Sequence, residues 1–188
     1  MRGTSRLVAV VLGVLALSSM SVLAGASSTP GAGGRGSEKS GGVVEITAYS
    51  SNDGPSSTAV VTGAIADFGT AVRTSANGAG AQQYNRLDLK VSRGSFALDI
   101  TALEKRLVTA FALFPTNLKT CSGVEVVKAS APVATGSGTG AYKGISGSFD
   151  LVVTINEVDT WPTCPRTGQN LLTESIFVTG SGTVSFRS

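Results

Sequence analysis

The sequence predicts an all-β protein, an eight-stranded antiparallel up-and-down barrel that carries one disulfide. Apolar and polar residues alternate with a period of two in several segments, as they do in strands with one buried face. Turn-forming stretches such as 52–55 (NDGP) and 93–94 (RG) separate these segments. The chain also has only two cysteines, Cys121 and Cys164. Short strands with short connections are typical of an antiparallel sandwich or barrel.

The alternation is clearest in the predicted strand 145–158, where Phe149, Leu151, Val153 and Ile155 share one face. Only Thr101 to Arg106 has a helical pattern, and that stretch is too short to predict more than a turn. We expect eight strands, near residues 43–49, 58–67, 84–92, 95–101, 106–114, 122–133, 145–158 and 172–187.

The first 26 residues have the pattern of a secretory signal peptide. A basic start is followed by the apolar run 7–17 and by an A-x-A site at 24–26, so cleavage is expected between Ala26 and Ser27. The alternative is a true membrane anchor, but the run is shorter than the roughly 20 residues that a span needs. We therefore expect a secreted, extracellular protein without a membrane span.

The rest of the chain divides into a lead-in and a domain. Residues 27–42 are rich in serine and glycine and cannot bury enough apolar surface to order themselves. Residues 43–188 are long enough for one domain with a hydrophobic core. We expect a flexible lead-in over 27–42 and the barrel domain over 43–188.

The charge pattern disfavours nucleic acid as a partner. Removing Arg2 and Arg6 from the 15 basic residues leaves 13, against 12 acidic residues. The remaining chain would be close to neutral, and no cluster of Lys or Arg stands out. The electrostatic signature of a nucleic-acid binder is missing.

The two cysteines predict a disulfide, because an even pair in an exported chain is usually bonded. In an up-and-down order both lie in loops at the same end of the barrel, as a disulfide requires. The alternative is two free thiols or a metal pair. Two thiolates in a chain without histidine make a poor zinc site.

The absence of histidine and of several motifs from the sequence excludes many classes of enzyme. A chain without histidine cannot build Ser-His-Asp or Cys-His catalysis or the usual metal centres. It has no G-x-S-x-G elbow and no calcium loop. We expect no metal and no cofactor, and of the common hydrolases only a carboxylate-based glycosidase stays open.

The densest glycine cluster outside the lead-in is 135–149, TGSGTGAYKGISGSF. It does not follow the order of a Walker loop, and a strand pattern rather than a helix follows it, so phosphate binding is disfavoured. Glycines permit sharp reversals and bends where a strand re-enters a sheet. We interpret the cluster as a barrel-closing turn at the end away from the disulfide, with structural roles for Gly136, Gly138, Gly140, Tyr142, Gly144 and Gly147.

This segment resembles the G-x-G-x-Y-x-G-x-x-G segment of the dirigent protein and allene oxide cyclase-like barrel superfamily. The ending 179–186 (TGSGTVSF) is similar to the last strand of secreted actinobacterial members. The resemblance implies an eight-stranded antiparallel barrel with an apolar cavity. It also implies that some relatives steer or catalyse cyclisation of small molecules and that many pack as dimers or trimers. The matching motif is architectural, so it assigns no catalytic residue.

Two acidic residues are the candidates for catalysis. Glu157 continues the apolar face of strand 145–158, and Glu174 shares its parity with Ile176 and Val178. If that face points inward, two carboxylates stand at the rim of an apolar cavity, where one could act as general acid or base. The alternative is that both are solvated charges at strand ends.

Tyr49 and Trp161 are the candidates for ligand binding, because we expect both near the mouth at the disulfide end. The alternative is ordinary loop packing. The leading functional hypothesis is a protein that binds a small apolar molecule in the barrel or directs its stereochemistry. The runner-up is a cofactor-independent cyclase or isomerase that uses a rim carboxylate. A third is a solid barrel acting as an extracellular interaction module, and a homo-oligomer stays open.

Overall fold

The fold is known from a computed structural model, which describes residues 41–52, 54–75, 84–112, 114–161, 164 and 171–187. The expected signal peptide, its cleavage site at Ala26 and Ser27, and nearly all of the lead-in lie outside the described residues. Among the described residues, no helix is both long and apolar enough to span a membrane.

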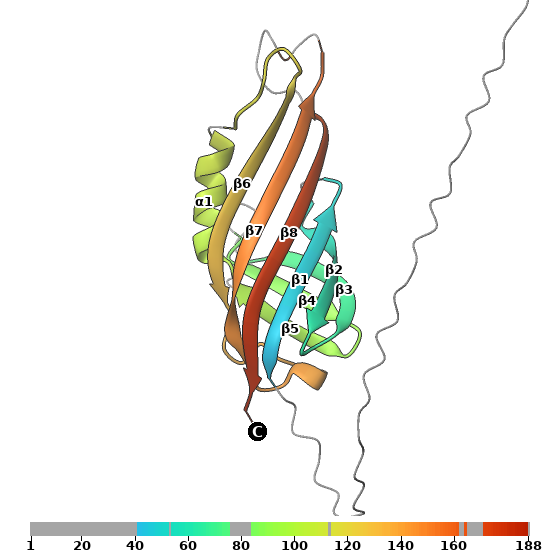
Figure 1. Cartoon of the computed structure of the whole chain (residues 1–188), viewed down its shortest axis with the longest axis vertical. Coiled ribbons are helices and arrows are strands. Elements are labelled where there is room, and N and C mark those ends of the chain that lie inside the picture. The colour runs from blue at the N-terminus through green and yellow to red at the C-terminus, as the bar shows by residue number, and fades with distance from the viewer. Residues whose placement is uncertain are drawn as a thin grey trace, which may run out of the picture. The chain divides into compact units, whose positions relative to one another are not determined.

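Within the described residues, eight antiparallel strands and the α-helix α1 make up the fold (Figure 1). The strand order in the sheet is β5-β4-β3-β2-β1-β8-β7-β6, so every strand lies beside its neighbours in sequence except at the gap between β5 and β6. The elements are β1 (Gly42–Ser50), β2 (Ser56–Gly63), β3 (Asp67–Thr74), β4 (Arg86–Val91), β5 (Gly94–Asp99), α1 (Thr101–Ala112), β6 (Ser122–Pro132), the 3-10 turn η1 (Gly140–Tyr142), β7 (Ile145–Asp159) and β8 (Leu171–Phe186).

The sheet curls strongly into a half-barrel that is open between β5 and β6. Among the described residues, one isolated bridge, from Leu98 of β5 to Val133 just after β6, links the two edges of the sheet. The inner side chains of the curled sheet form the hydrophobic core, which includes Ile46, Leu89 and Phe149. The sheet pairing thus matches the expected up-and-down order, with an opening where a closed barrel would have continuous strand pairing.

The glycine-rich segment runs along the free edge of β5. The backbone amides of Ala134 and Thr139 donate to the carbonyls of Ala97 and Ser95, each at 2.8 Å. The hydroxyls of Ser137 and Thr139 accept the amides of Ala97 and Ser95, each at 3.0 Å. The segment therefore satisfies backbone groups that an exposed edge strand would leave unpaired.

Tyr142 plugs this end of the half-barrel. Its side chain is buried, packs on Phe96 with ring centroids 5.2 Å apart, and donates a 2.5 Å hydrogen bond to the carboxylate of Asp67. The hairpin register, with Ser122 opposite Val158 and Pro132 opposite Ser148, places the glycine cluster at the opposite end of β6 and β7 from the disulfide.

Helix α1 was not predicted. The sequence indicates a strand at 106–114 and no more than a turn at 101–106, but the structure has one helix from Thr101 to Ala112. The carboxylate of Asp99 accepts the backbone amide of Thr101 at 2.9 Å and thereby caps the helix start. Leu103 and Leu107 are buried one turn apart. The guanidinium of Arg106 donates to the carbonyl of Lys128 on β6. The helix lies beside β6 in Figure 1 and covers part of the gap between the two edge strands.

A second correction concerns residues 58–74. The strand predicted at 58–67 is confirmed only as far as Gly63, where β2 ends, and β3 was missed; the two strands are joined by a short turn at Ala64–Ala66. The eight expected strands therefore match the observed number only because one missed strand and one misassigned helix cancel.

The three strands β6, β7 and β8 reach well beyond β1 towards the disulfide end (Figure 1). The last residue of β1, Ser50, pairs with Ile176, and β8 begins five residues earlier at Leu171. Glu157 and Glu174 lie in this extension, on the disulfide side of the point where β1 ends.

Candidate functional site

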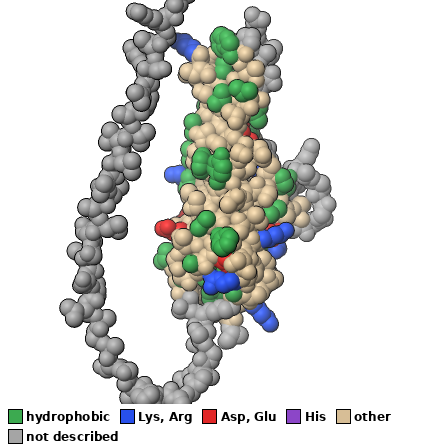
Figure 2. All heavy atoms as spheres, turned by 90° about the vertical axis from the view of Figure 1, so that its right-hand side faces the viewer, with side chains coloured by type: hydrophobic (Ala, Val, Ile, Leu, Met, Phe, Trp, Pro, Cys, Tyr) green, Lys and Arg blue, Asp and Glu red, His purple; other side chains and the backbone are tan. Residues whose placement is uncertain are grey.

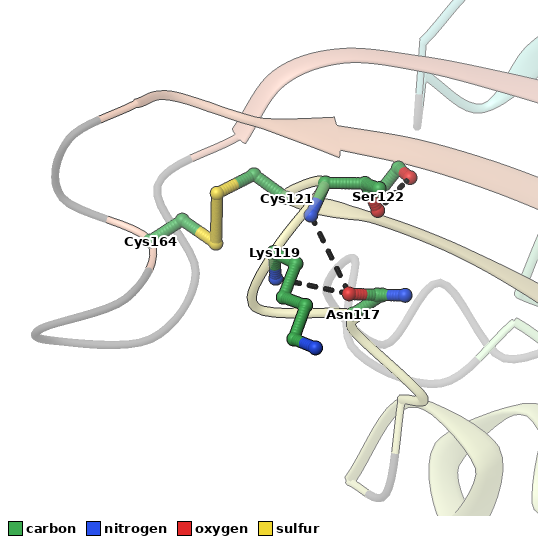
Figure 3. The surroundings of a disulfide bond; sticks show 6 residues. Asn117, Lys119, Cys121, Ser122 and Cys164 are labelled. Atoms are coloured by element: carbon green, nitrogen blue, oxygen red, sulfur yellow. Dashed lines mark hydrogen bonds between the residues drawn. A yellow bond between two sulfur atoms is a disulfide. The ribbon is translucent and has the colours of Figure 1, made fainter.

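The predicted disulfide between Cys121 and Cys164 is confirmed. The Cα atoms of the two residues are 5.9 Å apart (Figure 3). A turn at Asn117 leads into the bond: its carbonyl accepts the amide of Cys121 at 2.7 Å, and its side-chain oxygen accepts the amide of Lys119 at 2.9 Å. The carbonyl of Cys121 then accepts the amide of Asp159 at 2.7 Å. The bond thus ties the start of β6 to the chain that follows β7.

An apolar pocket lies between α1 and the concave face of the sheet. Its enclosed volume is about 50 Å³. Aliphatic side chains from the helix and from both halves of the sheet form most of its wall. The lining residues are Ala48, Ser50, Gly54, Ser57, Ala71, Arg73, Leu87, Ile100, Leu103, Glu104, Leu107, Phe111, Val153, Ile155, Ile176 and Val178. A space of this size holds a small apolar group rather than a whole ligand of ordinary size, for which about 300 Å³ is the usual minimum.

Two charged residues also line this pocket, and sequence reasoning missed both. Arg73 is the last residue but one of β3. Its guanidinium donates to the carbonyl of Gly54 at 3.3 Å and lies 4.9 Å from the ring centroid of Tyr84. Glu104 comes from the first turn of α1. Both belong to elements that the strand pattern did not reveal, so no sequence signal placed them at a cavity.

Glu157 and Glu174 face the concave side, as their parity predicts. They are directly opposite each other in the β7–β8 register and are only 8% and 5% exposed. The next inner residues on the two strands, Ile155 and Ile176, line the pocket. The carboxylate pair therefore lies one side-chain row beyond the pocket, about 7 Å along the strands. The two residues thus lie beside each other near the disulfide end, as the sequence predicts.

Aromatic side chains connect the pocket to the carboxylate row. The rings of Phe111 and Phe114 stack with centroids 6.3 Å apart, and Phe111 lines the pocket. Phe114 fills the space over Gly123, where a Cβ atom would lie 2.5 Å from the ring. Gly123 is the β6 partner of Glu157. The segment that follows α1 thus covers the inner face beside the carboxylates.

The two aromatic candidates are not brought together. Tyr49 points to the convex face of the sheet, where it is 45% exposed and contacts Phe177 with ring centroids 5.0 Å apart. It lies at the level of Thr154, in the middle of β7, whereas Trp161 follows the end of that strand and is 64% exposed. Neither residue lines the inner pocket.

The arrangement can hold an apolar group next to buried carboxylates. Carboxylates kept from water are where proton transfer to or from a bound molecule is easiest to arrange. Within the described ranges, no three His, Cys, Asp or Glu residues gather in a way that could hold a metal ion. Comparisons with protein-family models, with curated proteins and with solved structures give no match to the chain.

Proposed function

We propose that the protein binds a small apolar molecule between α1 and the concave face of the sheet. The observation that carries this proposal is the pocket itself, whose wall is largely aliphatic and whose lining includes Arg73 and Glu104. An apolar wall with a few polar groups is the usual composition of a small-molecule site. The enclosed 50 Å³ suits a narrow end of such a molecule, so a larger ligand requires α1 to move away from the sheet.

We also propose that the half-barrel is a variant of the dirigent and allene oxide cyclase-like barrel, and that the protein is secreted. The strand order supports the first proposal, because it is the order of an up-and-down barrel opened between β5 and β6. The disulfide supports the second, because such bonds persist mainly in oxidising compartments.

Native mass spectrometry of the protein purified from its own culture medium tests the binding proposal. We expect a retained small molecule, and we expect the Ala71→Leu variant to lose it, because Ala71 forms part of the pocket wall. The matched control is Ala131→Val, a buried change on β6 outside the pocket. Methyl NMR under xenon gives a second measurement, since xenon enters small apolar cavities. If no molecule is retained and no methyl resonance of Leu103 or Leu107 shifts, the proposal fails.

The position of the carboxylates favours a second candidate function, that of a cofactor-independent cyclase or isomerase. Glu157 and Glu174 are buried, paired across two strands and one row from the pocket. The test is to add the retained molecule back to the protein and follow its conversion by chromatography and mass spectrometry. Glu157→Gln or Glu174→Gln should abolish conversion while leaving binding intact. Conversion that survives both changes would exclude these residues as the acid or base.

A further inference from the structure

The convex face of the sheet carries an ordered set of side chains that the proposed function does not use. Strands β1 and β8 pair so that Tyr49 is opposite Phe177, Thr47 is opposite Thr179, and Glu45 is opposite Ser181. β7 continues two of these rows with Val152 beside Thr179 and Asp150 beside Ser181. We call this set of eight residues the outer groove.

The lower part of the outer groove is hollowed. A space of about 340 Å³ is lined by Glu45, Thr47, Asp150, Val152, Thr179 and Ser181, with Ile46 and Gly180 of the strands beneath. The floor is shallow because threonine and serine side chains are short, while Glu45 and Asp150 stand at opposite sides of Ser181.

The upper part of the outer groove is aromatic. Tyr49 and Phe177 are 45% and 43% exposed, and their ring planes are tilted by 45°. Two large apolar rings that keep this much surface in water are suited to stacking against a partner. Figure 2, which looks at the molecule from the right-hand side of Figure 1, shows hydrophobic side chains scattered among polar and charged ones on that face.

The charges of the hollow restrict the partner. Its lining contains two carboxylates and no lysine or arginine, so an anionic ligand would be repelled. Carboxylates accept strong hydrogen bonds from hydroxyl groups, and the threonine and serine hydroxyls can both donate and accept. The partner that suits this lining is therefore uncharged and rich in hydroxyl groups.

We propose that the outer groove binds a neutral oligosaccharide. A sugar ring has an apolar C–H face that stacks on aromatic rings and a rim of hydroxyls that carboxylates and hydroxyls can bind. Four residues of strand separate Tyr49 from Glu45, which is about 13 Å at the usual rise. One chain of linked sugars can thus stack on Tyr49 and Phe177 while its next units reach Glu45 and Asp150.

A second copy of the chain fits this face less well. A self-contact through the outer groove would bury the two carboxylates and the hydroxyls of Thr47, Thr179 and Ser181. Polar groups that lose water without gaining fixed partners make association costly. A sugar supplies hydrogen-bonding partners to the same groups, which is why the groove favours it over an apolar protein surface.

The test is affinity electrophoresis of the whole protein through gels that contain hydroxyethylcellulose, xyloglucan, glucomannan or soluble starch. We expect at least one polysaccharide to retard the protein. Tyr49→Ala and Phe177→Ala should each weaken that binding at least tenfold, and the Glu45→Gln/Asp150→Asn double variant should weaken it by a similar factor. Tyr49→Phe should bind like the parent protein because the ring remains.

Phe68→Ala is the matched control, since Phe68 is an exposed aromatic residue, 69% accessible, outside the outer groove. It should bind polysaccharide as well as the parent does. The proposal is overturned if none of the four polysaccharides retards the protein, or if Phe68→Ala and Tyr49→Ala weaken binding equally. It is also overturned if size-exclusion chromatography shows a dimer that Tyr49→Ala dissociates, because the groove would then be an interface between copies.

Discussion

The phenol of Tyr142 donates a 2.5 Å hydrogen bond to the carboxylate of Asp67, although the two residues are 75 positions apart. The same carboxylate accepts the hydroxyl of Ser92 at 2.5 Å and the backbone amide of Phe68 at 2.8 Å, and Arg93 is within 3.3 Å. One buried aspartate thus connects the start of β3, the β4–β5 turn and the glycine-rich segment. We infer that it holds the plugged end of the half-barrel together.

Removing the phenol should therefore weaken the fold. Tyr142→Phe keeps the buried ring but takes a donor away from a charged acceptor, and hydrogen bonds to charged groups contribute about 1.5–3 kcal/mol. We expect the free energy of unfolding, measured by urea denaturation, to fall by that amount. The control is Tyr49→Phe, a half-exposed tyrosine whose change should stay within about 0.5 kcal/mol. Equal effects in the two variants would contradict the role of the Tyr142–Asp67 bond.

Asp67 should also make stability depend on acid pH. Burial alone would raise the pKa of this carboxyl, but hydrogen bonds from Ser92, Tyr142 and the amides of Phe68 and Arg93 outweigh it and hold the pKa well below its usual range. Because the folded pKa is depressed, the stabilisation is present above the unfolded value of 3.8 and is lost as the pH falls below it. Urea unfolding near neutral pH and at about pH 3 should show the parent losing part of its advantage over Asp67→Asn. A constant difference between the two proteins would refute this.

Tyr142 should titrate late in alkali. Burial, together with the hydrogen bond to Asp67 and its negative charge, raises the pKa of Tyr142 from 10.0 to about 12. A raised folded pKa means that its stabilisation is complete below pH 10 and is lost as the pH rises towards 12. Ultraviolet absorbance of tyrosinate should therefore show an ionisation step well above pH 10. The late step should be missing in Tyr142→Phe, and its persistence there would assign it to another tyrosine.

The glycine-rich segment contains a matched pair of positions for a stability test. Gly136 and Gly144 have similar positive φ angles, +71° and +79°, but a Cβ at Gly144 would lie 2.2 Å from the carbonyl oxygen of Arg187, whereas one at Gly136 would meet nothing within 4 Å. Gly136→Ala should cost about 1 kcal/mol, the usual penalty for this backbone conformation. Gly144→Ala should cost about 2–4 kcal/mol, because the chain end must also move. Thermal unfolding that ranks the variants in the opposite order would show that the close approach to Arg187 is unimportant.

The sequence predicts the antiparallel half-barrel and the disulfide well because both depend on simple signals. Long strands with a strict period of two, such as β7, have one inner and one outer face along their whole length. Their alternation also placed Glu157 and Glu174 on the concave side. The number and spacing of cysteines were sufficient to pair Cys121 with Cys164.

The sequence pattern does not predict β3 or α1 in the same way. β3 has its aromatic residue, Phe68, on the outer face and a charged residue, Asp67, on the inner face, so its pattern is inverted at that end. In α1, the run from Leu107 to Phe111 is apolar enough to fit either a strand or a helix, since short apolar runs do not distinguish the two. Arg73 and Glu104 belong to these elements, which is why these two pocket-lining residues were missed.

The disulfide should be a major source of stability. It closes a loop with a sequence separation of 43, for which the chain-entropy model gives about 4 kcal/mol. We expect the Cys121→Ser/Cys164→Ser double variant to lose that amount in urea unfolding. Serine carries a Cβ atom as cysteine does, so we expect the strain of the positive φ of 50° at position 121 to be similar in the two proteins. Reducing the parent protein with dithiothreitol should bring it to the stability of the double variant. A loss below about 1 kcal/mol would mean that the ends of β6 and β7 are held by their strand pairing alone.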